Sequence, residues 1–532
     1  MLAAAFALAP APPAGSQPQR HPYTQPHVLR YATASDISGL NPHLNEESEL
    51  GYLSSLTMAW LVKTGPHNEL VPELATEVPS KANGGITPDG RTITYHLRRG
   101  VRWSDGAPFD ADDVVFSIKT VLNPATNEVS RDGWDRIVKI DEPDKYTVVL
   151  HLKERYSTYA YTFFSTTGAN PCVLPKHLLG ALANINSAPY NDLPVGIGPF
   201  RYVAWHRGDS VEMEANPYYF RGLPKLQRIV YKIVPDRNTV LTQLQTHELD
   251  LWLPVPAAYY ERLRGLSGLG VYREPSFAYD HVDFNLSHPV VADLAVREAL
   301  RYALDRETIR VKIRHGVGLL SDNIFGPNHP DYHPIPLVPF DLARARAILD
   351  QAGWKPGPDA IRAKNGVRLA LTFVIVSGSP DTDAIVELIR GTWSQIGVAL
   401  DVRRFPSSLL FATAAQNGIL DSGKFDVALT AWGLDNSGDV SGQFACASIP
   451  PAGQNHLHFC DPEADRAMTA FTLEYDVEKR KPLDYLATDR IASQVPSIVL
   501  DIRDWIFAYN GDLENFHPNG SAAFDNMMDV DI

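Results

Sequence analysis

Hydrophobic and polar residues alternate along several short stretches of the chain. Each stretch predicts a β-strand, because successive side chains of a strand point to opposite faces. One such stretch begins at Val28, and three others cover residues 91–97, 146–152 and 425–433. Residues 226–252 and 367–405 each have the pattern of a strand, a helix and a second strand. These patterns predict an α/β fold.

Capping residues mark the points where helices begin, because a side-chain carboxylate accepts a hydrogen bond from a free backbone N–H of the first turn. Asp110 precedes an amphipathic run that ends near Leu122, and Asp305 and Asp341 precede two further helical runs. Gly353 is a typical stop residue for the last of these helices.

The order of these elements predicts two α/β lobes. The chain leaves the first lobe, builds the second with helix-rich sequence up to about Gln494, and then returns to the first. Residues 272–285 and 495–510 are the expected hinge strands at the two crossings. Such a layout places a cleft between the lobes.

The strand predicted at 425–433 ends at Trp432 and Gly433, and an acidic turn with Asp435 and Asp439 follows. An aromatic ring and a carboxylate three residues later suit an organic-cation site, through cation–π contact and a charge-assisted hydrogen bond. The alternative is that Trp432 belongs to the core and Asp435 only begins a turn. An acid/base pair of Asp435 and Asp439 is disfavoured, because carboxylates four residues apart in a glycine turn are usually solvated or capping groups.

Length and charge narrow the class of protein. A chain of 532 residues exceeds one typical domain, and an aromatic content of 10% excludes a disordered chain. The net charge of −14 argues against a nucleic-acid partner, because phosphate binding needs a concentrated basic surface.

The N-terminus has the pattern of a leader. Residues 2–9 are apolar but too few to span a bilayer, and a Pro/Ala/Gln-rich stretch follows to about Gln25. This resembles the end of a secretory signal peptide, although a basic n-region is missing and Pro10 would hinder cleavage after Ala9. We expect residues 1–27 to be a signal remnant or flexible leader, and the protein to be exported.

The chain has 3 cysteines. Cys446 and Cys460 flank a polar loop of roughly 15 residues, and a disulfide there would contribute about 3 kcal/mol. The disulfide is favoured over unpaired thiols. A metal site with His456 and His458 is the weakest alternative, because the paired spacings of structural zinc sites are absent. Cys172 is expected to be a buried free thiol.

Five segments occur in the order and spacing of a known family. They are LNPH at 40–43, RTITYHLRRGVRWSDGAPFDADDVVFS at 91–117, VGIGPF at 195–200, DRNTVLTQLQTHELDL at 236–251 and VREALRYALDRETI at 296–309. On these segments the chain, from Val28 to Ile532, resembles the bacterial extracytoplasmic solute-binding proteins that serve dipeptide, oligopeptide and nickel ABC transporters. Each segment is weak evidence by itself, but the occurrence of all five in the same order over this length is strong evidence.

The resemblance implies an α/β, two-lobed periplasmic-binding-protein fold with hinge strands and an extra inserted subdomain. Lobe I is expected to combine residues 28–58, 190–283 and 497–532. The inserted subdomain is expected at 59–189, and lobe II at 284–496.

The resemblance also implies a ligand site. The segment containing Trp432 and Gly433 is expected to run beside the ligand as a strand, and Asp435 is expected to pair with a peptide's α-amino group. The segment after LNPH is expected to face the ligand backbone from the other lobe, with Asn45, Glu46, Glu47 and Ser48. This arrangement is β-augmentation, in which backbone groups supply affinity and one charge fixes the ligand's terminus. The Cys446–Cys460 pair also resembles a loop disulfide of dipeptide-type members.

One departure from the family pattern leaves the ligand open. Some dipeptide binders carry an Arg for the ligand carboxylate in a turn that is Ser377–Gly378–Ser379 in this chain. The ligand is therefore expected to be a peptide or a related small solute, with a sugar, an opine or a metal chelate as the alternative.

An enzyme is disfavoured, because the chain has no G-x-S-x-G, H-E-x-x-H or G-x-x-x-x-G-K-[ST] motif. A structural envelope protein is a remote alternative. We expect a periplasmic or extracytoplasmic monomer without cofactor or metal, which passes its solute to the permease subunits of an ABC importer.

Overall fold

The computed structural model describes most of the chain after the predicted leader. The described residues are 20–34, 36–45, 47–131, 133–166, 171–518, 523–524 and 526–532, without the side chains of Ser48 and Ala415. Residues 1–19 of the predicted leader lie outside the described residues.

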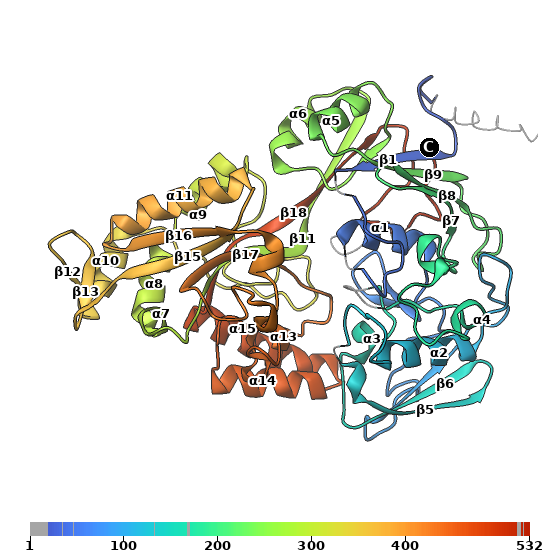
Figure 1. Ribbon diagram of the computed structural model, residues 1–532, viewed down its shortest axis with the longest axis horizontal. Helices are drawn as coiled ribbons and strands as arrows, with labels where there is room; N and C mark the ends of the chain where they lie inside the picture. Colours follow the sequence, from blue (N-terminus) through green and yellow to red (C-terminus); the bar gives the residue numbers. More distant parts are fainter. Residues whose placement is uncertain are drawn as a thin grey trace, which may run out of the picture.

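Within the described residues, one sheet of 10 strands runs through the whole molecule (Figure 1). Its order is β16 (Ala399–Phe405), β15 (Ala370–Val376), β17 (Val427–Gly433), β11 (Leu269–Phe284), β18 (Ser497–Asn510), β10 (Leu251–Trp252), β1 (Val28–Thr33), β9 (Arg228–Ile233), β8 (Ser210–Ala215) and β7 (Phe200–His206). The first strands of this order belong to the left lobe in Figure 1 and the last to the right lobe.

The long strands β11 and β18 connect the two lobes. They pair antiparallel from Leu269 opposite Asn510 to Asp283 opposite Ser497, and the register shifts between Pro275 and Tyr279. Both strands follow the residues expected to form the crossings, so the prediction of two long strands between the lobes is confirmed.

The two predicted strand–helix–strand units are present. In one unit, β15 and β16 pair in parallel on either side of α11 (Pro380–Ser394) in the sequence. In the other, α5 (Arg237–Gln245) connects β9 and β10, and β1 lies between these strands and pairs in parallel with both. The N-terminal strand therefore completes a unit that begins about 200 residues later.

Helices cover both faces of the sheet in the left lobe. On one face, α8 (Leu294–Tyr302), α10 (Leu342–Gln351) and α11 enclose a core that includes Val282 and Leu429. On the other face, α14 (Pro462–Leu473) and α15 (Val477–Gln494) enclose a core that includes Tyr279. Val282 and Tyr279 take opposite faces because strand side chains alternate.

The capping predictions are confirmed. Asp110 forms a capping box with Asp113 at the start of α2 (Ala111–Leu122), and Asp341 caps α10. Asp305 caps α9 (Arg306–Thr308), and the helix continues in the π conformation over Ile309–Ile313.

The right lobe contains α1 (Ser48–Thr57) and a separate sheet of β4 (Thr92–His96), β6 (Thr147–Leu152) and β5 (Ile137–Asp144). One hydrophobic cluster joins β1 and α1 to this sheet. The remaining short elements are β2 (Val62–Thr64), β3 (Leu70–Pro72), α3 (Tyr159–Thr162), α4 (Lys176–Leu179), α6 (Tyr260–Arg264), α7 (Pro289–Ala292), β12 (Lys355–Pro356), β13 (Arg362–Lys364), β14 (Val367–Arg368), α12 (Ser407–Leu410) and α13 (Ser441–Phe444).

The C-terminal residue lies beside the start of β1. The N–H of His27 donates to the carbonyl of Ile532 over 3.1 Å, and Ile532 is buried. Among the described residues, no helix has the length and apolar character needed to cross a membrane.

Candidate ligand-binding site

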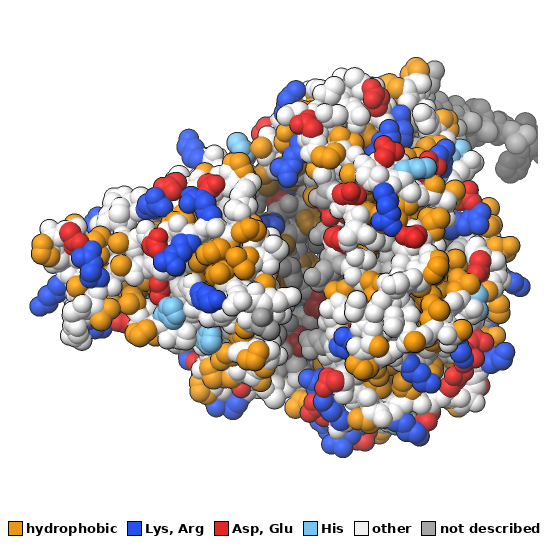
Figure 2. All heavy atoms as spheres, viewed as in Figure 1, with side chains coloured by type: hydrophobic (Ala, Val, Ile, Leu, Met, Phe, Trp, Pro, Cys, Tyr) orange, Lys and Arg blue, Asp and Glu red, His pale blue; other side chains and the backbone are white. Residues whose placement is uncertain are grey.

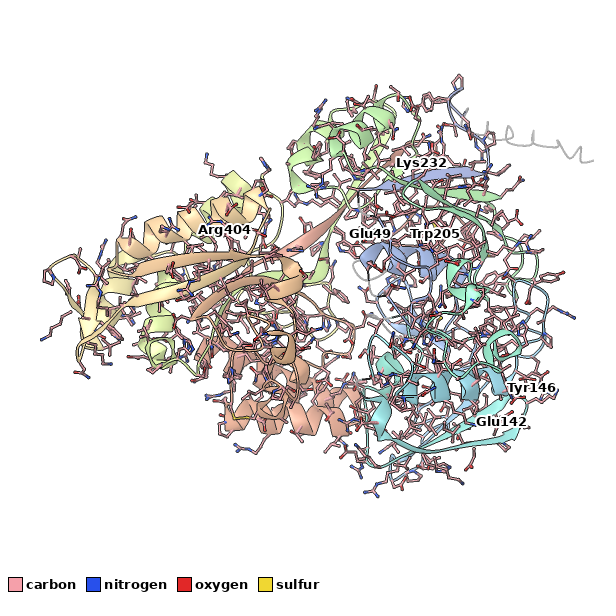
Figure 3. The ribbon with its side chains drawn as sticks, in the orientation of Figure 1. Glu49, Glu142, Tyr146, Trp205, Lys232 and Arg404 are labelled. Carbon is pink, nitrogen blue, oxygen red and sulfur yellow. A yellow bond between two sulfur atoms is a disulfide. The ribbon has the colours of Figure 1, made fainter. Side chains whose placement is uncertain are left out.

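A groove separates the two lobes on the face shown in Figure 2, and acidic side chains are visible inside it. The lobe that carries β17 forms one side, and the lobe that carries α1 forms the other (Figure 1). Figure 3 places Glu49 of α1 and Arg404 of β16 on these opposite sides.

Trp432 and Gly433 end β17, as the sequence predicts. Trp432 lies opposite Tyr279 of β11 and packs against the core under α14 and α15, while part of its ring stays exposed. Gly433 is exposed, and a Cβ added there would meet nothing within 4 Å. Trp432 therefore belongs to the core, and the exposed part of its ring and the open side of Gly433 leave a surface at the strand end.

Asp435 lies in the turn after β17 and is half-buried. Its Oδ1 accepts hydrogen bonds from the N–H of Ser437 over 2.8 Å and from the Ser437 hydroxyl. Nε2 of His329 donates to the backbone carbonyl of Asp435 over 2.8 Å. Within the described part of the chain, the other carboxylate oxygen of Asp435 accepts no hydrogen bond and no basic side chain forms an ion pair with it.

Burial raises the pKa of Asp435, and the Asp439 carboxylate adds to this effect against the opposing hydrogen bonds from Ser437. Burial lowers the pKa of His329 to about 4, so this histidine is neutral at physiological pH. The uncharged His329 supports the turn by its hydrogen bond and does not balance the charge of Asp435.

A further carboxyl group, that of Asp331, lies near Asp435, and the carboxyl group of Asp484 lies near Asp331 and Asp439. Burial raises the pKa of Asp331 against the opposing charges of Arg480 and Lys481, and the charge of Asp435 adds to the rise. Burial, with Asp331 and Asp439, raises the pKa of Asp484 well above its ordinary value. Among the described residues, Oδ2 of Asp484 has no hydrogen-bond partner. The carboxyl groups gathered here therefore outnumber the two nearby cations, Arg480 and Lys481.

The lobes touch close to Asp435. The side chain of Asn436 donates to the carbonyl of Asn68 in the right lobe over 2.7 Å. The Ser157 hydroxyl, also in the right lobe, donates to the carbonyl of Phe471 over 2.8 Å. These contacts join the lobes on one side of the groove.

The opposite wall is built around Ser38. Its hydroxyl donates to Oδ1 of Asn45 over 2.8 Å and to Oε1 of Glu47. Oε2 of Glu47 is buried and has no hydrogen-bond partner among the described residues. Glu46 and the side chain of Ser48 lie outside the described residues. Across the described chain, no hydrogen bond or ion pair joins Asn45 or Glu47 to the segment from Trp432 to Asp435.

The turn at Ser377–Ser379 has no basic residue of its own, but a basic residue from another segment lies close to it. Ser379 caps α11, and Asp381 lies in the first turn of that helix. Nη1 of Arg314 is 3.9 Å from Oδ2 of Asp381. Sequence reasoning missed Arg314 because 63 residues separate it from Ser377 and no local pattern connects the two positions.

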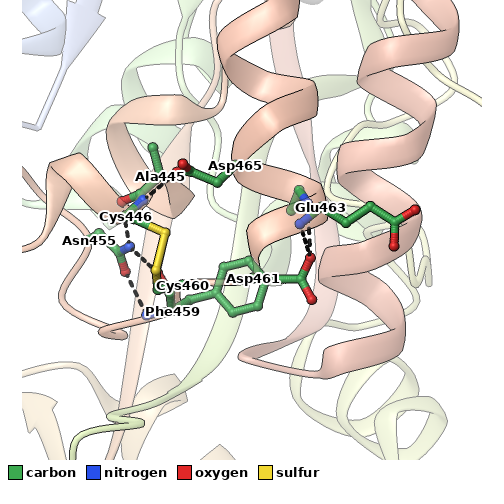
Figure 4. Close-up of a disulfide and its surroundings, with 9 residues drawn as sticks. Ala445, Cys446, Asn455, Phe459, Cys460, Asp461, Glu463 and Asp465 are labelled. Atoms are coloured by element: carbon green, nitrogen blue, oxygen red, sulfur yellow. Dashed lines mark hydrogen bonds between the residues drawn. A yellow bond between two sulfur atoms is a disulfide. The ribbon is translucent and has the colours of Figure 1, made fainter.

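The predicted disulfide between Cys446 and Cys460 is confirmed, with a Cα–Cα distance of 4.7 Å (Figure 4). Asn455 holds the enclosed loop by donating to the carbonyls of Ala445 and Phe459. The predicted free thiol, Cys172, is buried and unpaired. In the described ranges, no cluster of His, Cys, Asp or Glu has the arrangement of a metal site.

Comparison with known proteins decides the family. The family model of the bacterial extracellular solute-binding proteins, family 5 Middle, matches residues 69–448. The chain belongs to this family. Family 5 proteins are non-catalytic, so this protein is a substrate-binding protein of the ABC-transporter type and not an enzyme.

Individual relatives agree with this assignment. Protein XP55 of Streptomyces lividans is 31% identical over 427 residues, which cover 77% of this chain and 72% of XP55. The oligopeptide-binding protein AppA of Bacillus subtilis is 26% identical over 423 residues, which cover 78% of this chain and 75% of AppA. The structure of NikZ from Campylobacter jejuni in complex with Ni(L-His) matches with a TM-score of 0.77 and 25% identity, and the match covers 95% of this chain and 99% of NikZ. The two-lobed fold expected from the sequence is thus confirmed.

Proposed function

We propose that this protein captures short peptides with a free amino terminus in the groove between its lobes and delivers them to the permease subunits of an ABC importer. We further propose that it works as a monomer on the outer side of the cytoplasmic membrane. The name of AppA, an oligopeptide-binding protein, supports the peptide class.

The observation that carries this proposal is the state of Asp435. Its carboxyl group has a raised pKa, an oxygen without a hydrogen bond, and no cationic partner in the described chain. Taking a carboxylate even partly out of water is costly unless a cation lies opposite it. A ligand ammonium group supplies that cation, and the nearby Asp331 strengthens the attraction.

The proposed site has two walls. The first is the end of β17 with Trp432, Gly433 and Asp435, where the exposed part of the Trp432 ring and the open side of Gly433 leave room for an extended ligand. The second is the segment before and at the start of α1. There Oε2 of Glu47 lacks a donor and is placed to accept an N–H group of the ligand. We assign Asn45, Glu46 and Ser48 to this wall as well.

Closure of the lobes is the proposed mechanism. We assign residues 28–58, 190–283 and 497–532 to lobe I, 59–189 to an inserted subdomain, and 284–496 to lobe II. The strands β11 and β18 then act as hinges. A ligand that contacts both walls favours the closed form, in which Asn436 meets Asn68, over the open form.

A thermal-shift experiment with solute mixtures tests this proposal. A mixture of di- to hexapeptides with free amino termini should raise the Tm, because a ligand that binds only the native state stabilises it by mass action. A mixture of neutral monosaccharides is the control and should leave the Tm unchanged. A Tm that peptides leave unchanged and that monosaccharides or nickel–histidine raise would contradict the peptide class.

A further inference from the structure

A cluster of charged residues lies at the hinge strands, apart from the site around Asp435, and Arg314 joins it from the segment after the π helix. Asp280 of β11 lies opposite Asp501 of β18. Arg503 donates from Nε and Nη2 to the two oxygens of Asp280, over 2.8 and 2.6 Å. Arg314 donates from Nη2 to Asp280 over 2.8 Å, and its Nε is 3.5 Å from Oδ2 of Asp501.

This hinge cluster lies between the two lobes. Arg503 and Trp505 are two residues apart on β18 and therefore point to the same face. Trp505 packs edge-on against Tyr52 of α1, with ring centroids 6.1 Å apart, so this face points toward the lobe that contains α1. On the other side, Arg314 reaches Asp381 in the first turn of α11. Arg314 and Arg503 thus lie where both lobes meet the hinge.

Both arginines keep donors that the described residues do not use. Arg503 makes its hydrogen bonds with Nε and Nη2, and its side chain is 47% exposed. Nη1 of Arg503 donates to no described residue. Arg314 makes one hydrogen bond, from Nη2, and its side chain is 21% exposed. Asp280 therefore orients two guanidinium groups. The Nη1 side of Arg503 stays open, while Nε and Nη1 of Arg314 face Asp501 and Asp381 over 3.5 and 3.9 Å without a hydrogen bond. Guanidinium donors held in this way can bind a carboxylate.

The charge of the cluster depends on one proton. Burial and the Asp280 carboxylate raise the pKa of Asp501 to about 7, in spite of Arg314 and Arg503. Burial opposes the charged form of Asp280 as well, but the hydrogen bond and charge of Arg503 and the charge of Arg314 lower its pKa. Oδ1 of Asp501 is buried without a donor in the described chain, which suits an oxygen that carries the proton.

The other charged groups around Asp501 do not change this balance. Asp381 is 56% exposed on its side chain and 3.9 Å from Arg314. On the neighbouring part of the hinge, Asp504 pairs with Arg273 over 3.0 Å and accepts the N–H of Gly318. With Asp501 neutral, Arg314 and Arg503 face only one buried carboxylate, Asp280, and the buried cluster carries one positive charge.

We propose that Arg314 and Arg503 bind the carboxylate of the ligand, and that Asp501 is protonated in the ligand-bound state. This inference rests on the proposed function and adds a second anchor to it. Asp435 binds the amino terminus, and the two hinge arginines bind the carboxyl terminus. The site then prefers zwitterionic peptides, and the missing basic residue at Ser377–Ser379 is replaced by Arg314, which reaches the same helix start from another segment.

The distance between the two anchors suits a short peptide. Trp432 and Ile502 lie on strands two places apart, so their backbones are ~10 Å apart. Asp435 lies three residues beyond Trp432, which adds at most ~10 Å along the strand direction. An extended peptide spans about 3.3 Å per residue, so we expect a ligand of about three to five residues.

Two matched mixtures of tetrapeptides test the inference. Both mixtures have free amino termini, and one has free carboxylates while the other has amidated carboxyl termini. The wild-type protein should bind the carboxylate mixture at least tenfold more tightly at pH 6, and the preference should shrink at pH 8, where Asp501 loses its proton. Arg503→Gln should lose most of the preference at pH 6. Arg273→Gln, which removes another hinge arginine, is the matched control and should keep it.

The outcomes separate this inference from the proposed function. If the wild type binds both mixtures equally well at pH 6, the inference is wrong and the peptide function stands. The inference is equally wrong if folded Arg503→Gln keeps the full preference. If neither mixture binds to the wild type, the result contradicts both the proposed peptide function and the proposed carboxylate site. The wild-type comparison at two pH values decides the question even where Arg503→Gln does not fold.

Discussion

Asp280 and Asp501 lie directly opposite each other on the two strands that connect the lobes. Like charges in this position of a sheet repel each other, so the pair favours a state in which one carboxyl group is neutral. Arg314 and Arg503 keep Asp280 charged, and the proton therefore stays on Asp501. A protonation change on one residue is thus built into the two strands that connect the lobes.

Asp501→Asn should flatten the dependence of stability on pH. The folded pKa of Asp501 is raised to about 7, so its stabilising contribution is present at pH below 4 and is lost as the pH rises through 7. The variant should be more stable than the wild type at pH 8, by up to ~4 kcal/mol, with a smaller difference at pH 5.5. Urea unfolding at the two pH values measures this.

The exposed Asp381 provides the control for that experiment, since it lies at the edge of the same cluster. Asp381→Asn should leave the pH dependence of stability as it is in the wild type. If Asp501→Asn and the wild type lose the same stability between pH 5.5 and 8, Asp501 does not carry a proton at pH 5.5 that it loses by pH 8.

Asp435→Asn should stabilise the protein in the absence of ligand. A raised pKa means that the contribution of this carboxyl group to stability is lost as the pH rises through its folded value, so the charged form weakens the fold at pH 7. Stabilisation by ~1 kcal/mol is typical when a group held for function is removed. A higher Tm for the ligand-free variant would agree with this account, and a lower Tm would show that Asp435 has a structural role.

Arg306 illustrates a buried charge with a purely structural role. Its side chain is 4% exposed and donates to Asp322 over 2.7 Å and to the carbonyl of Val499 over 2.9 Å. Arg306→Met should cost ~3–5 kcal/mol, because Asp322 then stays buried without a partner. Arg310→Gln, which breaks an exposed pair with Glu307 in the same segment, should cost less than ~1 kcal/mol. Similar losses in both variants would contradict the burial argument.

The disulfide should stabilise the loop between Cys446 and Cys460. Closing a loop of this size contributes about 3 kcal/mol, so a variant with both cysteines changed to serine should unfold at lower urea concentration. Thiol titration supplies a separate check. The unfolded protein should react as one thiol before reduction, from Cys172, and as 3 after it. Three reactive thiols before reduction would show that the bridge is absent.

The sequence was sufficient to predict most of the helices and strands, because the residues that determine them lie within or next to each element. Asp110 and Asp341 predict the starts of their helices because they are capping residues. The alternation of hydrophobic and polar residues over 425–433 predicts β17. The crossings at β11 and β18 also followed from the order of elements. The position of β1 between β9 and β10 did not, because pairing between distant strands leaves no mark in a local pattern.

The site was only partly predictable for the same reason. Trp432 and Asp435 are neighbours in one motif, and the motif pointed to them. Asp331 lies near Asp435 from a separate segment, and Arg314 meets Arg503 only because both bind Asp280. Their raised or lowered pKa values result from burial and from each other's charge, and neither can be read from sequence spacing.

The most direct test of Asp435 as the amine anchor is a titration of the wild-type protein with a peptide that it retains, in a free and an N-acetylated form. Acetylation removes the ammonium group that Asp435 is proposed to bind. The account predicts that the acetylated peptide binds at least 100-fold more weakly to the wild type, and that Asp435→Asn binds the two forms with similar, low affinity. Equal binding of both forms to the wild type would contradict the assignment of Asp435 as the anchor of the ligand's amino terminus.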